Sequence, residues 1–113
     1  MKTLKIIFVT ISIFIISNRV NAQNDTIRIK TSAICDQCKD RIENDLSFEK
    51  GIKSSNLDLK TNVLTVIYNP KKTEPQKIRE AITHIGYDAD SLKADLRSYN
   101  KLPDCCKHPD KHN

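Results

Sequence analysis

The sequence lacks a hydrophobic run long enough to cross a membrane as a helix. Its longest uncharged apolar stretch, IIFVTISIFII, covers residues 6–16, whereas a membrane-spanning helix needs about 20 apolar residues. The stretch follows Lys2 and Lys5 and is followed by small residues that end at Ala22, which is the pattern of a secretory signal peptide. We therefore expect a signal peptide at residues 1–22 and a secreted or periplasmic protein after cleavage, with an uncleaved anchor as the alternative.

A strong charge imbalance is also missing. The formal net charge of +5 falls to +2 without residues 1–22, because Lys2, Lys5 and Arg19 leave and no acidic residue leaves with them. A nearly balanced surface gives no electrostatic case for binding nucleic acid. The rest of the chain has room for one small domain. We expect this domain at residues 23–94 and a flexible C-terminal tail at residues 95–113.

The hydrophobic pattern predicts the order strand, helix, strand, strand, helix. Apolar residues alternate within TIRIKTSAI (residues 26–34) and on both sides of residues 60–62, which indicates strands and a hairpin. They recur at helical spacing over residues 36–48 and again over 73–86. A weak last strand is expected within residues 87–95. This order predicts an α+β, ferredoxin-like βαββαβ sandwich, in which two helices cover one face of an antiparallel sheet.

Capping residues set the expected limits of the second helix. Thr73 is the expected N-cap, with Pro75 in the first turn and Gln76 three residues after the cap. Gly86 is the expected C-terminal stop. A further amphipathic helix carrying Leu92, Leu96 and Tyr99 is a weaker expectation.

The sequence has four cysteines, and two of them form a CxxC motif where the first strand gives way to the first helix. Cys35 is expected in the loop and Cys38 in the first helical turn, where free backbone N–H groups and the helix dipole lower thiol pKa values. Two thiolates on one short loop suit a soft ion such as Cu(I) or Hg(II). Structural Zn(II) takes four ligands, so the tail or a partner would have to complete a zinc site.

Two other interpretations of the motif remain open. In a thiol–disulfide oxidoreductase Cys35 would attack and Cys38 would resolve. Against this, Asp36 and Gln37 stand between the cysteines instead of a Gly-Pro type pair, and the charge of Asp36 would raise the pKa of both thiols. The other interpretation is a secreted domain with two structural disulfides, since an even number of cysteines outside the cytosol usually means disulfides.

Three segments together resemble the heavy-metal-associated domain family, which includes copper chaperones, modules of copper-transporting ATPases and periplasmic mercury-binding proteins. They are AICDQC at the expected metal loop, GIKSSNLDLKTNVLTVIYNP at the hairpin, and IREAITHIGYDAD at the second helix. The resemblance covers roughly residues 25–90. It implies that Cys35 and Cys38 are the metal ligands and that Tyr87 shields the thiolates. Ala33 and Ser32 stand where the family usually has methionine and glycine.

The C-terminal tail carries Cys105, Cys106, His108 and His112, all of types that bind borderline metals. Adjacent cysteines in an extended chain point to opposite sides, and a disulfide between them would be strained. Three alternatives follow: loose thiols or a tail disulfide, a second metal site, or completion of the Cys35 and Cys38 site.

From the residues and the resemblance we expect an exported metal-binding protein and not an enzyme. It would capture a soft ion, Cu(I) before Hg(II) or Zn(II), and pass it to a metal-transporting membrane protein or another carrier. Mercury scavenging is the close alternative. We expect a monomer, with a metal-bridged dimer as the alternative.

Overall fold

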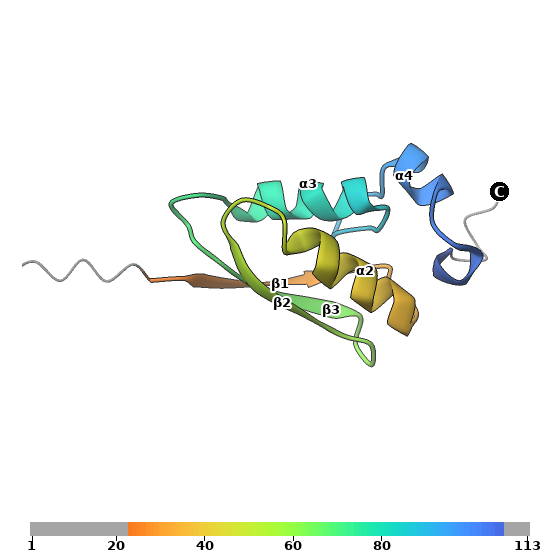
Figure 1. Cartoon of the computed structure of the whole chain (residues 1–113), viewed down its shortest axis with the longest axis horizontal. Coiled ribbons are helices and arrows are strands. Elements are labelled where there is room, and N and C mark those ends of the chain that lie inside the picture. Colours follow the sequence, from red (N-terminus) through yellow and green to blue (C-terminus); the bar gives the residue numbers. More distant parts are fainter. Residues whose placement is uncertain (1–22, 108–113) are drawn as a thin grey trace, which may run out of the picture.

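A three-stranded antiparallel sheet with two helices on one of its faces forms the body of the protein (Figure 1). The computed structural model describes residues 23–107. Its elements, in chain order, are β1 (Asp25–Lys30), α2 (Asp36–Leu46), β2 (Ile52–Asp58), β3 (Val63–Tyr68), α3 (Pro75–Ile85), α4 (Leu96–Asn100) and a short 3-10 helix, η2 (Asp104–Cys106). The strand order is β1-β3-β2. The expected α+β, ferredoxin-like class is confirmed.

The register of the sheet places the alternating apolar residues on the helix-covered face. Ile29 of β1 lies opposite Leu64 of β3, and Leu57 of β2 lies opposite the same Leu64 from the other side. Side chains of a strand alternate between its faces, so Val66 follows Leu64 onto the same side. All four residues are buried, as the sequence pattern predicts.

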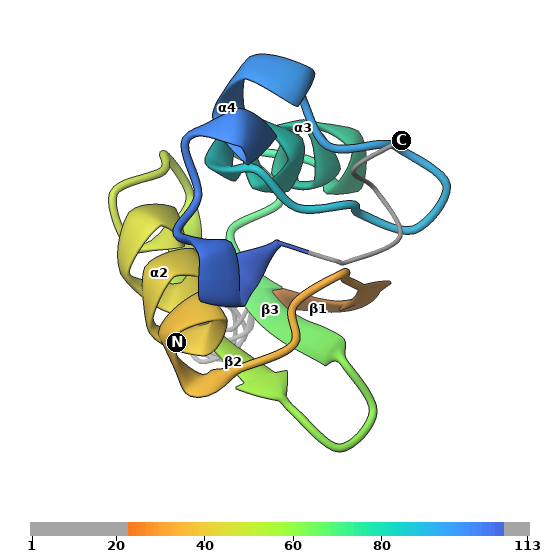
Figure 2. The same ribbon diagram turned by 90° about the vertical axis from the view of Figure 1, so that its right-hand side faces the viewer.

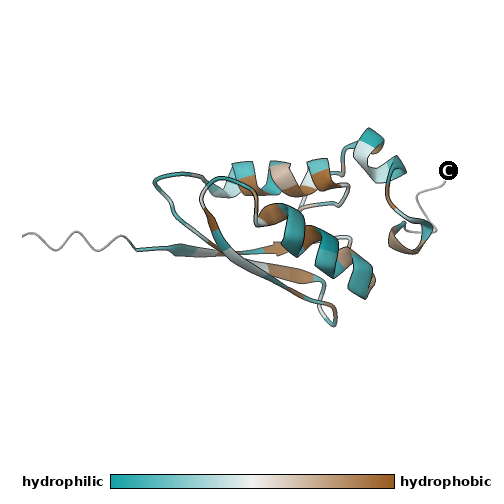
Figure 3. Cartoon of the chain, viewed as in Figure 1, coloured by the Kyte–Doolittle hydropathy of each residue, from teal (hydrophilic) through white to brown (hydrophobic). Residues whose placement is uncertain are grey.

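The two helices complete the core from above the sheet. Cys38, Ile42 and Leu46 of α2 are fully buried. Ile78 and Ile82 of α3 are at most 1% exposed. Figure 3 shows apolar residues on the sides of the helices that face the sheet, with polar residues on their outer sides. The helical spacing seen in the sequence therefore identifies the buried faces correctly.

A lysine ties the first turn of α2 to strand β2. The Lys39 ammonium donates to Glu43 Oε1 at 2.9 Å, to Asn56 Oδ1 at 3.0 Å and to the backbone carbonyl of Leu57 at 2.9 Å. Glu43 Oε1 in turn accepts the Leu57 N–H at 3.2 Å. These bonds fix the start of α2, and with it the second cysteine of the CxxC motif, against the sheet.

The helix limits differ in two places from those expected. The N-cap of α3 is Glu74, which is extended and makes no side-chain cap bond, so the expectation of Thr73 as the cap is wrong. Pro75 at the first helical position needs no N–H partner, which makes a side-chain cap less necessary. Helix α2 ends at Leu46, before the expected Phe48, which is 82% exposed. Gly86 ends α3 with a positive φ of 118°, as expected.

The expected last strand is reduced to one bridge. Ala89 pairs with Thr31 beside β1, and then with Leu92 in its own turn. Asp90 has a φ of 52°, which bends the chain away from the sheet, and its carboxylate accepts the Lys30 N–H at 2.9 Å. The chain therefore turns back after one bridge and does not continue along β1.

The C-terminal segment, residues 95–107, carries α4 and η2 where a flexible tail was expected, and the rest of that expected tail, residues 108–113, lies outside the described residues. Helix α4 and η2 return the chain to the N-terminal end of α2 (Figure 2). Tyr99, Leu102 and Cys106 are buried, whereas Leu96, expected on the apolar side of a helix, is 71% exposed. Within residues 23–107 no helix is long and apolar enough to span a membrane. The expected signal peptide lies outside the described residues.

Candidate metal centre

The two cysteines of the CxxC motif lie side by side at the start of α2. Cys35 is the extended residue before the helix, and Cys38 is in its first turn. Their Sγ atoms are 3.1 Å apart, and the thiols are all free in this structure. Cys38 is fully buried and Cys35 is half-buried. The positions predicted for these residues, loop and first turn, are those observed.

The loop that carries Cys35 is held at its N-terminal side by two hydrogen bonds. The Ser32 hydroxyl accepts the Asp88 N–H at 2.9 Å, which joins the loop to the segment after α3. The Thr31 N–H donates to the backbone carbonyl of Asn62 at 2.8 Å, which joins the loop to the hairpin turn. The residue after Ser32, Ala33, is fully buried. No pattern in the sequence indicates the contact between Ser32 and Asp88.

The two thiols have opposite pKa shifts. Burial favours a raised pKa at Cys38, but interactions with the Cys106 thiol, the Ile34 backbone, the Tyr87 hydroxyl and the Cys35 thiol outweigh it and lower the pKa. Burial and the neighbouring Cys38 thiol raise the pKa of Cys35. The expectation that both pKa values fall is therefore wrong for Cys35. Two thiols this close titrate as a coupled pair, so the first proton leaves the pair more easily than the second.

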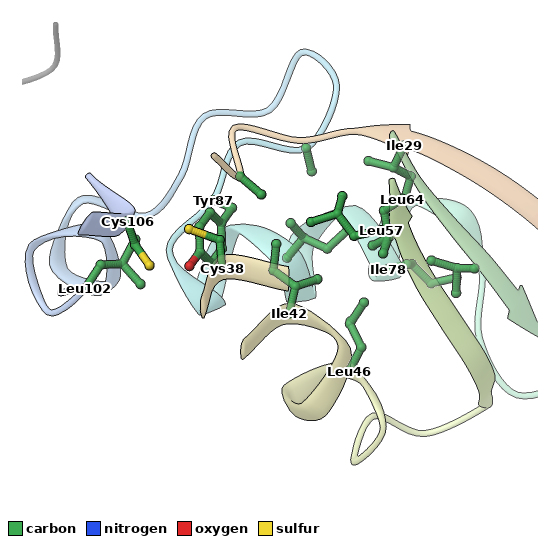
Figure 4. Packing of buried hydrophobic residues seen from close by; sticks show 14 of the residues in the cluster. Ile29, Cys38, Ile42, Leu46, Leu57, Leu64, Ile78, Tyr87, Leu102 and Cys106 are labelled. Atoms are coloured by element: carbon green, nitrogen blue, oxygen red, sulfur yellow. The ribbon is translucent and has the colours of Figure 1, made fainter. Parts of the chain in front are cut away.

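Tyr87 lies against the cysteines, at the end of the core nearest to them (Figure 4). Its side chain is fully buried, and its hydroxyl oxygen has no hydrogen-bond partner of good geometry among the described residues. Burial raises the pKa of Tyr87 far above its usual range, and the thiols of Cys38 and Cys106 raise it further. The ring therefore closes the inner side of the cysteine loop, the place from which the expected shielding of the thiolates would act.

Replacing Tyr87 by phenylalanine is expected to raise the free energy of unfolding by about 1 kcal/mol, since a buried polar group without a good partner costs about 1–3 kcal/mol. Urea denaturation measures this effect. A loss of stability of 1 kcal/mol or more in Tyr87→Phe would show instead that the hydroxyl is well bonded.

The C-terminal cysteines lie against the CxxC motif. The Sγ atom of Cys106 is 3.7 Å from that of Cys35 and 3.9 Å from that of Cys105. The Cys105 thiol donates to Gln37 Oε1 at 2.9 Å, a contact that sequence reasoning missed. The sulfurs of Cys35, Cys105 and Cys106 all lie within 4.8 Å of one another.

Of the three alternatives for the tail, this placement favours completion of the first site. His108 and His112, the other candidate ligands of the tail, lie outside the described residues. A second site made of the four tail residues would need these two histidines.

The geometry of the motif allows both sulfurs to bind one ion. Metal–thiolate bonds are about 2.3 Å long, so two sulfurs on one ion are separated by at most about 4.6 Å. The 3.1 Å separation of Cys35 and Cys38 falls within this limit. The sulfurs are soft donors, and the site lies at a helix N-terminus, which stabilises their anionic form. The arrangement can hold a soft cation at the surface end of the core.

Comparison with known proteins finds a matching family model described as "Heavy-metal-associated domain", which covers residues 29–88. The match includes both cysteines of the CxxC motif and Tyr87. The C-terminal segment from Tyr99 to Cys106 falls outside it.

Two curated proteins illustrate the similarity. Copper-transporting ATPase 1 of Rattus norvegicus is 38% identical over 63 residues, which are 56% of this chain and 4% of the ATPase. Copper chaperone CopZ of Staphylococcus haemolyticus is 33% identical over 54 residues, which are 48% of this chain and 79% of the chaperone. The chain thus spans only a small part of the ATPase but most of the chaperone's length.

A solved structure agrees with these relatives. The water-soluble region of the P-type ATPase CopA from Bacillus subtilis superimposes with a TM-score of 0.57 and 32% sequence identity. The match covers 60% of this chain and 46% of that one.

Proposed function

The chain belongs to the heavy-metal-associated domain family, and on this premise we propose that it binds a soft metal ion, Cu(I) before all others, and passes it to a partner. The observation that carries the proposal is the pair of thiol sulfurs 3.1 Å apart at the start of α2. The copper-transporting relatives support the choice of Cu(I). Cys35 and Cys38 are the proposed ligands.

Transfer proceeds by ligand exchange, with the ion as cargo. An incoming thiolate of the partner binds the ion before a resident sulfur leaves, so the ion is never free. Each metal–sulfur bond that forms releases one thiol proton, and each sulfur that leaves takes one up. Cys35 is half-buried, so an incoming thiolate reaches the ion from its side and Cys35 is the ligand that leaves first. Cys38 is fully buried, so it holds the ion longest.

The proposed partner is a metal-transporting membrane protein or another carrier, and the protein itself is a carrier and not an enzyme. The relatives named as copper-transporting ATPases and as a copper chaperone support this choice. We further propose that the chain acts outside the cytosol after cleavage near Ala22. The apolar run at residues 6–16 supports export.

The oxidoreductase alternative is disfavoured by the electrostatics of the motif. An attacking cysteine must be exposed and present as a thiolate. Cys35, the more accessible thiol, has a raised pKa, whereas the thiol with the lowered pKa, Cys38, is fully buried. This combination suits a buried metal anchor better than a nucleophile.

Native mass spectrometry of the chain from Gln23 to Asn113, titrated anaerobically with Cu(I), tests the proposal. This part contains every element that the structure describes. We expect one Cu(I) ion per chain, retained against a modest thiol competitor, and its appearance on an added metal-binding domain of a copper ATPase. Parallel titrations with Hg(II) and Zn(II) identify the preferred cargo. Retention of none of the three ions would contradict metal carriage.

A further inference from the structure

Cys106 is placed at the metal loop by its own packing, independently of any ion. Its side chain is 1% exposed, although it follows the exposed Cys105 and lies near the end of the described chain. The η2 turn that carries it is closed by the Cys106 N–H, which donates to the Pro103 carbonyl at 2.9 Å. Four residues earlier, the buried Leu102 anchors the segment in the core.

Leu102 packs against the C-terminal end of α3. An added side-chain carbon at Gly86 would lie 3.1 Å from Leu102 Cγ and Cδ2, so Leu102 packs directly on the glycine that ends α3. Figure 4 shows Leu102 and Cys106 together beyond Tyr87 and Cys38, at one end of the core. The sulfur of Cys106 is therefore held over the motif by apolar contacts of neighbouring residues.

We propose that Cys106 is a third sulfur ligand of the ion bound at Cys35 and Cys38. The inference rests on the proposed function and deepens it, because it assigns a ligand that lies outside the matched family region. One ion is then held by three sulfurs of a single chain, two from the loop before α2 and one from the C-terminal segment.

Burial favours Cys106 over Cys105 for this role, and the distance from Cys106 to Cys35 fits it. Three sulfurs about 2.3 Å from one ion in a plane are separated by about 4.0 Å. The 3.7 Å between Cys35 and Cys106 is close to that value, and the 3.1 Å between Cys35 and Cys38 requires only a small opening of the loop. Cys105 is exposed, and its thiol already donates to Gln37 Oε1.

The third ligand decides which ions fit and how they leave. When the bond to the ion forms, the Cys106 thiol loses its proton to water, and the bond breaks when a partner's thiolate replaces it. Three thiolates suit a soft ion, whereas structural Zn(II) needs a fourth ligand. The loaded site therefore already has the three-coordinate arrangement that ligand exchange passes through.

X-ray absorption spectroscopy of the Cu(I)-loaded chain from Gln23 to Asn113 tests the proposal without a substitution. We expect three sulfurs around the ion in the wild type and in Cys105→Ser, and two in Cys106→Ser. Anaerobic competition titrations should show a Cu(I) affinity at least about tenfold weaker in Cys106→Ser. Loss of even an indirect partner of a metal ligand commonly costs roughly 10- to 100-fold. Cys105→Ser is the matched control, with an adjacent thiol and an expected change below about threefold.

The outcomes separate this inference from the proposed function. If only two sulfurs surround Cu(I) in the wild type, and Cys106→Ser and Cys105→Ser bind Cu(I) equally well, Cys106 is not a ligand. The proposed carrier function would not be affected by that result. Failure of the wild type to retain Cu(I) would overturn both. Circular dichroism of the metal-free variants checks their folding, and the wild-type sulfur count decides the question if Cys106→Ser is unfolded.

Discussion

Replacement of both Cys35 and Cys38 by serine is expected to abolish retention of Cu(I) against a thiol competitor. A serine hydroxyl keeps its proton at neutral pH and is a hard oxygen donor, which a soft ion does not prefer. The double variant keeps Cys105 and Cys106 but lacks Cys35, whose sulfur lies near those of both Cys38 and Cys106. Native mass spectrometry of the double variant measures the loss directly.

The single variants rank the two ligands. Cys38→Ser is expected to weaken Cu(I) binding more than Cys35→Ser, because Cys38 is fully buried and water cannot easily replace its sulfur on the ion. A hydroxyl at this buried site also costs about 1–3 kcal/mol of folding free energy unless it finds a partner, so Cys38→Ala is made in parallel. If the double variant still retains one ion with the affinity of the wild type, Cys35 and Cys38 are not the ligands.

Substitution of alanine for Gly86 is expected to lower the free energy of unfolding by about 1–3 kcal/mol, since a side chain at its positive φ is strained. The new methyl group would lie 3.1 Å from Leu102 Cγ and from the Ser98 carbonyl oxygen. Leu102 must therefore move, and Cys106 moves with it. We expect a Cu(I) affinity as weak as that of Cys106→Ser, together with a melting temperature at least about 4 °C lower.

Gly51 offers a matched control for this substitution. It also has a positive φ, of 85°, and an added side-chain carbon would lie 2.9 Å from Thr73 Cγ2. Gly51 follows the C-terminal end of α2, whereas Cys35 and Cys38 lie at its N-terminal end. Gly51→Ala is expected to lose a similar amount of stability in thermal denaturation but to keep the wild-type affinity for Cu(I). Equal losses of affinity in the two glycine variants would show that general destabilisation, and not displacement of Leu102, weakens the site.

The core of the fold was predictable because it depends on local periodicity. Alternation at Ile27 and Ile29, and helical spacing from Cys38 through Ile42 to Leu46, assign these residues to the inward faces that they occupy. Gly86 was predictable as a helix stop because few other residues take a positive φ at low cost. The CxxC motif could be placed for the same reason, since it stands at the junction of two periodic segments.

The C-terminal segment was not predictable, because its position depends on contacts between residues far apart in the sequence. Cys35 and Cys106 are separated by 71 positions, and no repeat or spacing connects them. Tyr99, Leu102 and Cys106 are the buried residues of this segment, but Pro103 interrupts any continuous helix through them, so no long periodic pattern marks Leu102 as an anchor. The raised pKa of Cys35 follows from its burial and from the adjacent Cys38 thiol, whereas the sequence showed only the favourable helix start.

The single bridge between Ala89 and Thr31 has a consequence for association between molecules. Strand β1 is an outer strand of the sheet, and beyond this bridge no strand of the described chain covers its free side. An uncovered strand is a template to which a second chain can add. Asp25, Arg28 and Lys30 place charges along this short strand, and in natural sheets such residues oppose edge-to-edge pairing. The charges on β1 thus help to keep separate molecules from joining their sheets into one.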